Sequence, residues 1–112
     1  VVMRNAAWNK YEVAILLEGY IRIANGNANR KDVAKEISER LRHEKKHESI
    51  TYRNINGITL QLGAIEYLMT DGAHGISHVS NLFKEIVKLY KEDNCAFQHF
   101  LEEANKMYPK NH

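Results

Sequence analysis

One segment, residues 52–62, combines side-chain types that are suited to recognising nucleic acid. It reads YRNINGITLQL and brings together an arginine, two asparagines, a threonine and a glutamine. Arginine, asparagine and glutamine form bidentate hydrogen bonds with base edges, and the free N–H groups at the start of a helix favour a phosphate. The segment therefore predicts a contact with double-stranded DNA, with the candidate residues Arg53, Asn54, Asn56, Thr59 and Gln61.

The same segment also has a purely structural interpretation, which the sequence leaves open. Asn54 is a suitable helix cap, and Arg53 can pair with a carboxylate such as that of Glu12. Gly57 and Gly63 each cost about 1 kcal/mol inside a helix but allow another backbone to come close. In this alternative the segment is a corner that caps one helix and ties it to another.

The positive charge of the chain is concentrated in its first half. Residues 1–60 carry eleven Lys and Arg against seven Asp and Glu, whereas residues 61–112 carry five against seven. An anionic partner is therefore expected to contact the first half. The residues expected to attract phosphates electrostatically are Arg30, Arg42, Lys45 and Lys46.

The histidines do not form a pattern that is specific for a metal site. The pairs His43/His47 and His74/His78 have helical i, i+4 spacing, but the first lies in a charged stretch and the second spans a glycine-containing loop. Two histidines at this spacing are a weak signal for zinc. We interpret them as surface residues and assign no metal.

Nucleophilic catalysis has no better support. Cys95 and His99 are the one Cys/His pair in a segment expected to be helical, but neither a third orienting group nor an oxyanion site accompanies them. We therefore assign no catalytic residue and no cofactor, and expect no enzymatic activity from this chain.

Composition favours a single cytoplasmic domain. The 112 residues are sufficient for one core and include a single cysteine, which rules out an internal disulfide and suits a reducing compartment. No apolar run approaches the roughly 20 residues that cross a membrane. We therefore expect a soluble protein without membrane contact.

Apolar residues recur with a helical period in five segments, and no segment alternates as a strand does. The predicted helices cover about residues 8–24, 30–42, 54–69, 78–92 and 94–108, with Asn29 and Ser77 as the caps of the second and fourth. In the third, the apolar stripe through Ile58 and Leu62 predicts that four residues face away from the core: Asn56, Thr59, Gly63 and Glu66.

These elements predict an all-α domain of five helices. We expect residues 1–7 to be a flexible segment and residues 8–112 to form one domain. Within it, residues 8–70 are expected to form a helix-turn-helix-like tri-helical core, to which residues 76–108 add two helices. The predicted buried centre consists of Trp8, Leu16, Leu17, Tyr20, Val33, Ile37, Leu41, Ile58, Leu62 and Ile65.

Three short motifs occur in order along the chain. They are Trp8-x-x-x-Glu12, Ile37-Ser38-x-x-Leu41-Arg42, and Tyr52-Arg53-Asn54-x-Asn56-Gly57-Ile58 followed by Gln61-Leu62. Together they resemble the small N-terminal helical domain of bacterial HNH-type endonucleases of the modification-dependent restriction kind, which also occurs on other multidomain bacterial proteins. The resemblance covers about residues 8–70, and Ile55 stands where that family usually has proline. The motifs also show a looser likeness to tri-helical Myb/SANT domains.

The resemblance implies a DNA-targeting accessory module of a larger restriction- or defence-like protein. Its catalytic partner domain would lie downstream of His112 in a longer parent chain. The HNH nuclease motif itself is absent from residues 1–112, so the resemblance implies no nuclease activity for this chain. The Myb/SANT likeness implies a third helix that enters DNA.

A protein-interaction or oligomerisation module without nucleic-acid contact is the alternative function. Residues 76–108 are rich in aromatic side chains, and the apolar arc of the fourth predicted helix is wider than a simple surface helix requires. The extra width predicts either deep burial or a partner surface, including self-association through residues 76–108. Deletion of residues 76–112 should unfold the chain if these helices close the core.

Overall fold

The computed structural model describes residues 7–42, 53–77 and 79–110, and these ranges contain helices and loops but no strand. The five helices are α1 (Lys10–Ala24), α2 (Arg30–Arg42), α3 (Ile55–Met69), α4 (Asn81–Glu92) and α5 (Asn94–Met107). The predicted all-α, five-helix domain is confirmed. The segment expected to be flexible, residues 1–7, lies outside the described residues except for Ala7.

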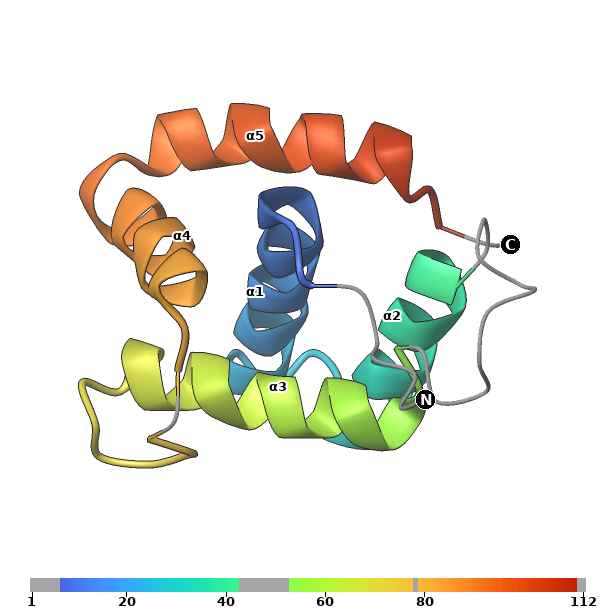
Figure 1. Ribbon diagram of the computed structural model, residues 1–112, viewed down its shortest axis with the longest axis horizontal. Helices are drawn as coiled ribbons and strands as arrows, with labels where there is room; N and C mark the ends of the chain where they lie inside the picture. The colour runs from blue at the N-terminus through green and yellow to red at the C-terminus, as the bar shows by residue number, and fades with distance from the viewer. Residues whose placement is uncertain (1–6, 43–52, 78, 111–112) are drawn as a thin grey trace, which may run out of the picture.

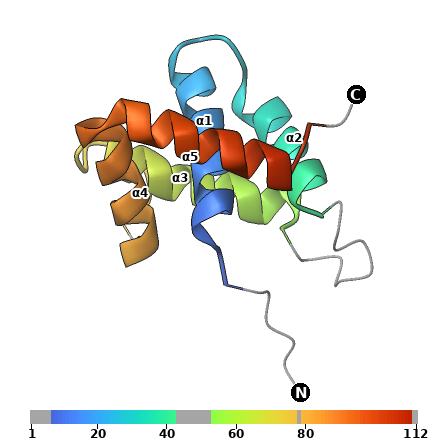
Figure 2. The same ribbon diagram turned by 90° about the horizontal axis from the view of Figure 1, so that it is seen from above.

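α1 lies at the centre of the molecule and packs against all four other helices. α3 runs along one side of α1 and α5 along the other, while α4 and α2 lie at opposite ends of the arrangement (Figure 1). Seen from above, α5 crosses over α1 (Figure 2). Because neighbours surround α1, eight of its residues are buried, and one of them is the acidic residue Glu12.

One cluster of apolar side chains, contributed by all five helices, forms the core. Nine of the ten residues predicted at its centre are buried, and the tenth, Trp8, is half-buried. Trp8 precedes α1 and packs edge-on against Phe83, with 6.0 Å between the ring centroids. It also lies against the guanidinium of Arg53, so it covers the edge of the core rather than filling its centre.

α4 and α5 complete this core rather than being added to a finished three-helix unit. Both helices pack against α1, and α4 also packs against α3. Burial therefore explains the wide apolar arc of α4, and a chain that lacks residues 76–112 is expected to unfold. The buried residues of the two helices are Phe83, Ile86, Val87, Phe97, Leu101 and Ala104.

Every helix begins with a polar side chain that accepts a hydrogen bond from the backbone N–H three residues on. Asn29 has this role in α2, as predicted, and Asn54 has it in α3. The prediction of Ser77 as the cap of α4 is wrong: α4 begins at Asn81, because Ser80 accepts the N–H of Phe83 at 3.3 Å. The remaining caps are Asn9 and Asp93.

Two glycines allow the loop before α4 to lie directly on α3. The N–H of Ile76 donates to the carbonyl of Gly63 at 3.0 Å, and the Ile76 side chain covers Gly63. A Cβ on Gly75, whose φ angle is +97°, would collide with the backbone of Gly63 and Tyr67. The close backbone approach predicted at Gly63 is therefore present.

A helix that spans a membrane is both long and apolar, and the helices of this protein are short. Within the ranges that the structure covers, none is both long enough and apolar enough to cross a bilayer.

Candidate nucleic-acid interface

The end of α2 and the start of α3 form a corner that encloses an open hollow of about 480 Å³. The two helices pack against each other: Arg30 at the start of α2 contacts Glu66 late in α3, and Ser38 late in α2 contacts Arg53 just before α3. We call this region the α2–α3 corner. Among the residues that the structure describes, those that line it are Ser38, Arg42, Asn54, Ile55 and Asn56.

Arg53 has a structural role beside this corner. Its Nε and Nη2 atoms donate to Oε2 and Oε1 of Glu12 at 3.0 and 2.9 Å, and the two side chains are 3% and 2% exposed. Nη2 also donates to the carbonyl of Ala7 at 3.2 Å, and the guanidinium lies 4.3 Å from the centre of the Trp8 ring. The pairing that the sequence left open as an alternative is thus formed, and the guanidinium is turned into the protein.

Glu12 has two functions in the fold. Its backbone N–H donates to the side chain of Asn9 at 2.9 Å, and its Oε1 accepts the N–H of Asn9 at 3.0 Å. This reciprocal arrangement is a capping box, which an acidic residue three positions after the cap predicts. The same carboxylate holds Arg53, so the start of α1 and the start of α3 are fixed together.

The backbone at Arg53 is held in an unfavourable conformation. Its φ angle is 47°, in the left-handed region that costs a non-glycine residue about 1–2 kcal/mol. Such strain persists only where the surrounding contacts fix it. Here Glu12 holds the side chain, and the hydroxyl of Ser38 donates to the Arg53 carbonyl at 2.7 Å. Together these contacts set the direction in which α3 begins.

Asn56 and Thr59 face solvent, as the helical pattern predicts. The Thr59 hydroxyl donates to the carbonyl of Ile55 at 2.9 Å, so its proton is already used within the helix. The same prediction is wrong for Gly63, which is buried beneath Ile76.

The remaining candidate residues do not gather at one place. Gln61 is half-buried and lines a second hollow of about 360 Å³ between the start of α1 and the start of α4. Arg30 is ion-paired with Glu66 at 3.2 Å, so Glu66 is also half-buried rather than directed freely into solvent. Lys45 and Lys46 lie outside the described residues.

The start of α3 carries two exposed apolar side chains that the sequence analysis did not identify as site residues. Ile55 is 43% exposed and Leu60 is 55% exposed. Leu60 has a signal in the sequence, because it falls outside the apolar stripe through Ile58 and Leu62, whereas Ile55 has the spacing of that stripe and its exposure at the first position of α3 has no such signal. With Asn56 and Thr59 they make an exposed surface without a charged group.

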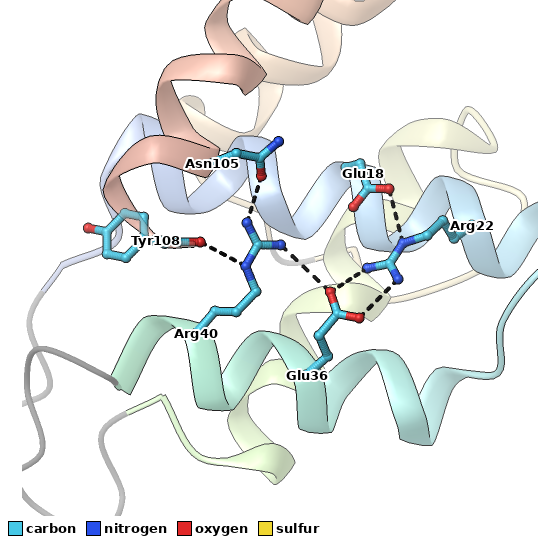
Figure 3. A network of polar contacts seen from close by, with 6 residues as sticks. All are labelled: Glu18, Arg22, Glu36, Arg40, Asn105 and Tyr108. Carbon is cyan, nitrogen blue, oxygen red and sulfur yellow. Dashed lines mark hydrogen bonds and ion pairs between the residues drawn. The ribbon is translucent and has the colours of Figure 1, made fainter. Parts of the chain in front are cut away.

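A polar cluster centred on Arg40 joins α1, α2 and α5 (Figure 3), and the sequence did not reveal it. Arg40 is 2% exposed. Its Nε donates to the carbonyl of Tyr108 at 2.8 Å and its Nη2 to Oδ1 of Asn105 at 2.6 Å, while Nη1 lies 3.6 Å from Glu36. Since α2 and α5 do not otherwise pack together within the described part of the chain, Arg40 bridges them.

Glu36 is shared between Arg40 and Arg22. Both terminal nitrogens of Arg22 donate to Glu36, at 3.1 and 2.9 Å, and its Nε lies 3.0 Å from Glu18. Burial lowers the pKa of Arg40, and Glu36 and Glu18 oppose this only in part. Burial by itself would raise the pKa of Glu36, but hydrogen bonding and attraction from Arg22 outweigh it and lower that pKa. The cluster is a structural tie between helices.

Within the described part of the chain, the other polar groups do not add a chemical centre to the corner. Among the residues that the structure describes, no three His, Cys, Asp or Glu side chains gather to hold a metal ion. Cys95 and His99 are both exposed on α5, and His43, His47 and His78 lie outside the described ranges. Comparison of the sequence with family models, with curated proteins and with solved structures found no match.

Proposed function

We propose that this chain is a DNA-binding module that contacts double-stranded DNA with the α2–α3 corner and the exposed start of α3. The observation that carries the proposal is the lining of the corner, where Arg42, Asn54 and Asn56 lie together among the residues that the structure describes. Phosphates are attracted to arginine and to helix N-termini, and asparagine amides hydrogen-bond base edges. The corner therefore offers both kinds of contact in one concave surface.

In this proposal Arg53 is a positioning residue. Its pairing with Glu12 fixes the place where α3 begins, and backbone strain of the kind found at Arg53 is common at functional sites. The proposed contacts are Arg42 at the end of α2 and the side chains of Asn56 and Thr59 on α3, the helix that Asn54 caps. Lys45 and Lys46, which follow Arg42 along the chain, are proposed to supply phosphate contacts. Arg30 and Gln61 are left out, because they lie on other surfaces.

The proposal includes a role within a larger protein. We assign no catalytic centre to the described residues of this module, and a module that only binds DNA is useful where another domain acts on that DNA. The resemblance of its motifs to the N-terminal domain of HNH-type endonucleases supports a catalytic domain elsewhere in a longer parent chain. The module would then target that activity.

Fluorescence anisotropy with labelled duplex and single-stranded DNA at low and high salt tests the proposal. Binding is expected to prefer the duplex and to weaken steeply with salt, because bound cations displace counterions from the phosphates. Arg42→Ala is expected to reduce affinity for all duplexes and to reduce the salt slope by about 1. Asn56→Ala is expected to weaken specific binding while leaving that slope unchanged.

Two matched variants control these measurements. Lys88→Ala removes a cation from the exposed side of α4, and Asn94→Ala removes an exposed asparagine from the first turn of α5. Neither is expected to change DNA affinity. Duplex binding that is absent at low salt, or equally reduced by the control variants, contradicts the proposal.

A second candidate function is docking of a protein partner or of a second copy at the hollow between α1 and α4. The observation that favours it is the apolar lining of that hollow, which includes Trp8, Val79, Leu82 and Phe83. Size-exclusion chromatography with light scattering tests it over a range of concentrations. Self-association that Leu82→Lys abolishes would support docking, and a monomer at all concentrations argues against a second copy.

A further inference from the structure

Two asparagines of the chain are followed directly by glycine, and the fold places them in different surroundings. The pairs are Asn25-Gly26, at the end of α1, and Asn56-Gly57, in the first turn of α3. Asparagine is chemically labile, and a following glycine favours reaction because it has no side chain to hinder a close approach of its backbone nitrogen. Both asparagines are exposed, so water reaches each of them.

We infer that Asn25 is a site of spontaneous deamidation and that the fold protects Asn56 from the same reaction. At the reactive pair, the backbone nitrogen of Gly26 attacks Cγ of Asn25 and forms a cyclic succinimide. The Cγ–Nδ2 bond breaks, and the amide leaves as ammonia with the proton of the attacking nitrogen. A water molecule then opens the ring at either carbonyl, which gives aspartate or isoaspartate at position 25.

The surroundings of Asn25 allow this ring to form. Residues 24–27 are all exposed, and Gly26 lies beyond the end of α1 with a φ angle of +78°. Among the described residues, a Cβ on Gly26 would meet no atom within 4 Å apart from the adjoining residues. The N–H of Gly26 donates to the carbonyl of Ile23 at 3.0 Å and must leave it before the attack. Exposed chain at the end of a helix opens at a low cost in free energy, so the reactive geometry is accessible.

Asn56 is protected because its backbone belongs to a fixed helix start. The N–H of Gly57, whose nitrogen would have to attack, donates to Oδ1 of Asn54 at 2.8 Å. The next residue, Ile58, is completely buried, and its N–H donates to the carbonyl of Asn54 at 2.9 Å. Ring closure would turn the Asn56 backbone out of its helical conformation and pull this turn away from the core. The reaction at Asn56 therefore requires a packed segment to open, which costs more free energy.

Deamidation at Asn25 changes both the charge and the main chain at the end of α1. The new carboxylate lies at the negative end of the helix dipole, where an anion is unfavourable. The formal net charge falls from +2 to +1, and isoaspartate also lengthens the main chain of the connection between α1 and α2. Aged protein is therefore expected to contain a second, more acidic form that cation-exchange chromatography separates.

Peptide mapping by mass spectrometry follows the reaction in the full chain during incubation in mildly alkaline buffer. In the folded protein, conversion at Asn25 is expected to be at least tenfold faster than at Asn56, which corresponds to about 1.4 kcal/mol of additional opening free energy. In concentrated urea, which unfolds the chain, the two rates are expected to become similar. A protein isoaspartyl methyltransferase labels the isoaspartate product and confirms the route through the succinimide.

Three variants assign the rates to particular groups. Asn54→Ala removes the acceptor of the Gly57 N–H and is expected to speed conversion at Asn56 about fivefold, the equivalent of the roughly 1 kcal/mol that such a cap contributes. Gly26→Ala is expected to slow conversion at Asn25 several-fold, because the added methyl group hinders the attack. Asn27→Ser is the matched control: Asn27 is exposed in the same turn but precedes alanine, and its loss is expected to leave the rate at Asn25 unchanged.

The outcomes test the reactive site and the protected one separately. If Asn25 stays intact in the folded protein while the unfolded chain reacts, the assignment of Asn25 is overturned. Equal rates at Asn25 and Asn56 in the folded protein overturn the protection, as does an Asn56 rate that Asn54→Ala leaves unchanged. Circular dichroism checks that each variant is folded. If Gly26→Ala does not fold, the comparison of the two sites in the parent chain decides the inference.

Discussion

Two buried arginines hold the helices together, and they differ in whether their partners are buried as well. Arg53 forms two hydrogen bonds to Glu12, whose side chain is 2% exposed. Arg40 is held by a backbone carbonyl and by Asn105 of α5, and lies at the longer distance of 3.6 Å from Glu36, whose side chain is 33% exposed. Arg53 therefore forms an ion pair in which both charges are buried, whereas Arg40 is a buried cation whose acidic partner is partly exposed.

This difference shows that the cost of losing a buried arginine depends on what it leaves behind. Without Arg53, the Glu12 carboxylate would remain in the interior with no cation nearby, which is costly in a medium of low dielectric constant. Without Arg40, the exposed Asn105 can be solvated and Glu36 keeps Arg22. Burial of the partner should therefore matter more than burial of the arginine.

Arg53→Met is expected to have the largest effect, lowering the free energy of unfolding by about 3–5 kcal/mol. Methionine fills much of the same volume, so the loss reports mainly on the stranded Glu12 carboxylate. Urea denaturation followed by circular dichroism measures it. Combining Glu12→Gln with Arg53→Met removes the stranded charge and is expected to recover part of the loss. If Arg53→Met alone were as stable as the parent protein, burial of the partner carboxylate would not set the cost of losing the arginine.

Arg40→Met is expected to cost less, about 1–2 kcal/mol, because it removes two hydrogen bonds without stranding a buried charge. The same denaturation experiment compares it directly with Arg53→Met. A loss as large as that of Arg53→Met would show that burial of the arginine itself sets the cost.

Glu36→Gln is expected to lower the free energy of unfolding at neutral pH by at most about 1 kcal/mol, since Glu36 is partly exposed. The folded state holds the pKa of Glu36 below its ordinary value of 4.5, so its stabilising contribution is present above that pH. The contribution is lost as the pH falls through the folded-state pKa. The difference between variant and parent should therefore shrink in acid, as denaturation curves at several pH values can show; a constant difference would exclude this linkage.

Glu66→Gln is expected to have the smallest effect, lowering the free energy of unfolding by less than about 0.5 kcal/mol. The reason is that both side chains of the ion pair between Glu66 and Arg30 are partly exposed to solvent. High salt should reduce even this difference by screening. Thermal denaturation with and without added salt measures it. A cost comparable to that of Arg40→Met would mean that partial exposure does not weaken ion pairs in this protein.

The helices could be predicted because their signals are local. The cap Asn29 and the stripe through Ile58 and Leu62 depend on residues within a few positions of one another. The error at Ser77 has a nonlocal origin, because the chain before α4 is fixed on α3 by the contact between Ile76 and Gly63. That contact joins two segments of the chain, and no local pattern in either segment indicates that they meet.

The candidate site could be predicted only in part. The segment around Asn54 and Asn56 was identified, and both residues line the corner. The direction of the Arg53 side chain depends on Glu12, which is 41 positions away, and that of Arg40 on Asn105, which is 65 positions away. The sequence offered the pair of Arg53 with Glu12 as one alternative, but a polar pattern along one helix does not decide whether an arginine turns toward a partner in the protein or toward a ligand.

The all-α class, the five helices and nearly all of the central apolar residues follow from the sequence, because periodicity and capping act within a few turns. The burial of Arg53 and Arg40 and the exposure of Ile55 depend instead on how the helices pack. Whether a charge can be buried depends on partners that distant segments bring to it, and on the low dielectric constant that exists only after the helices have packed.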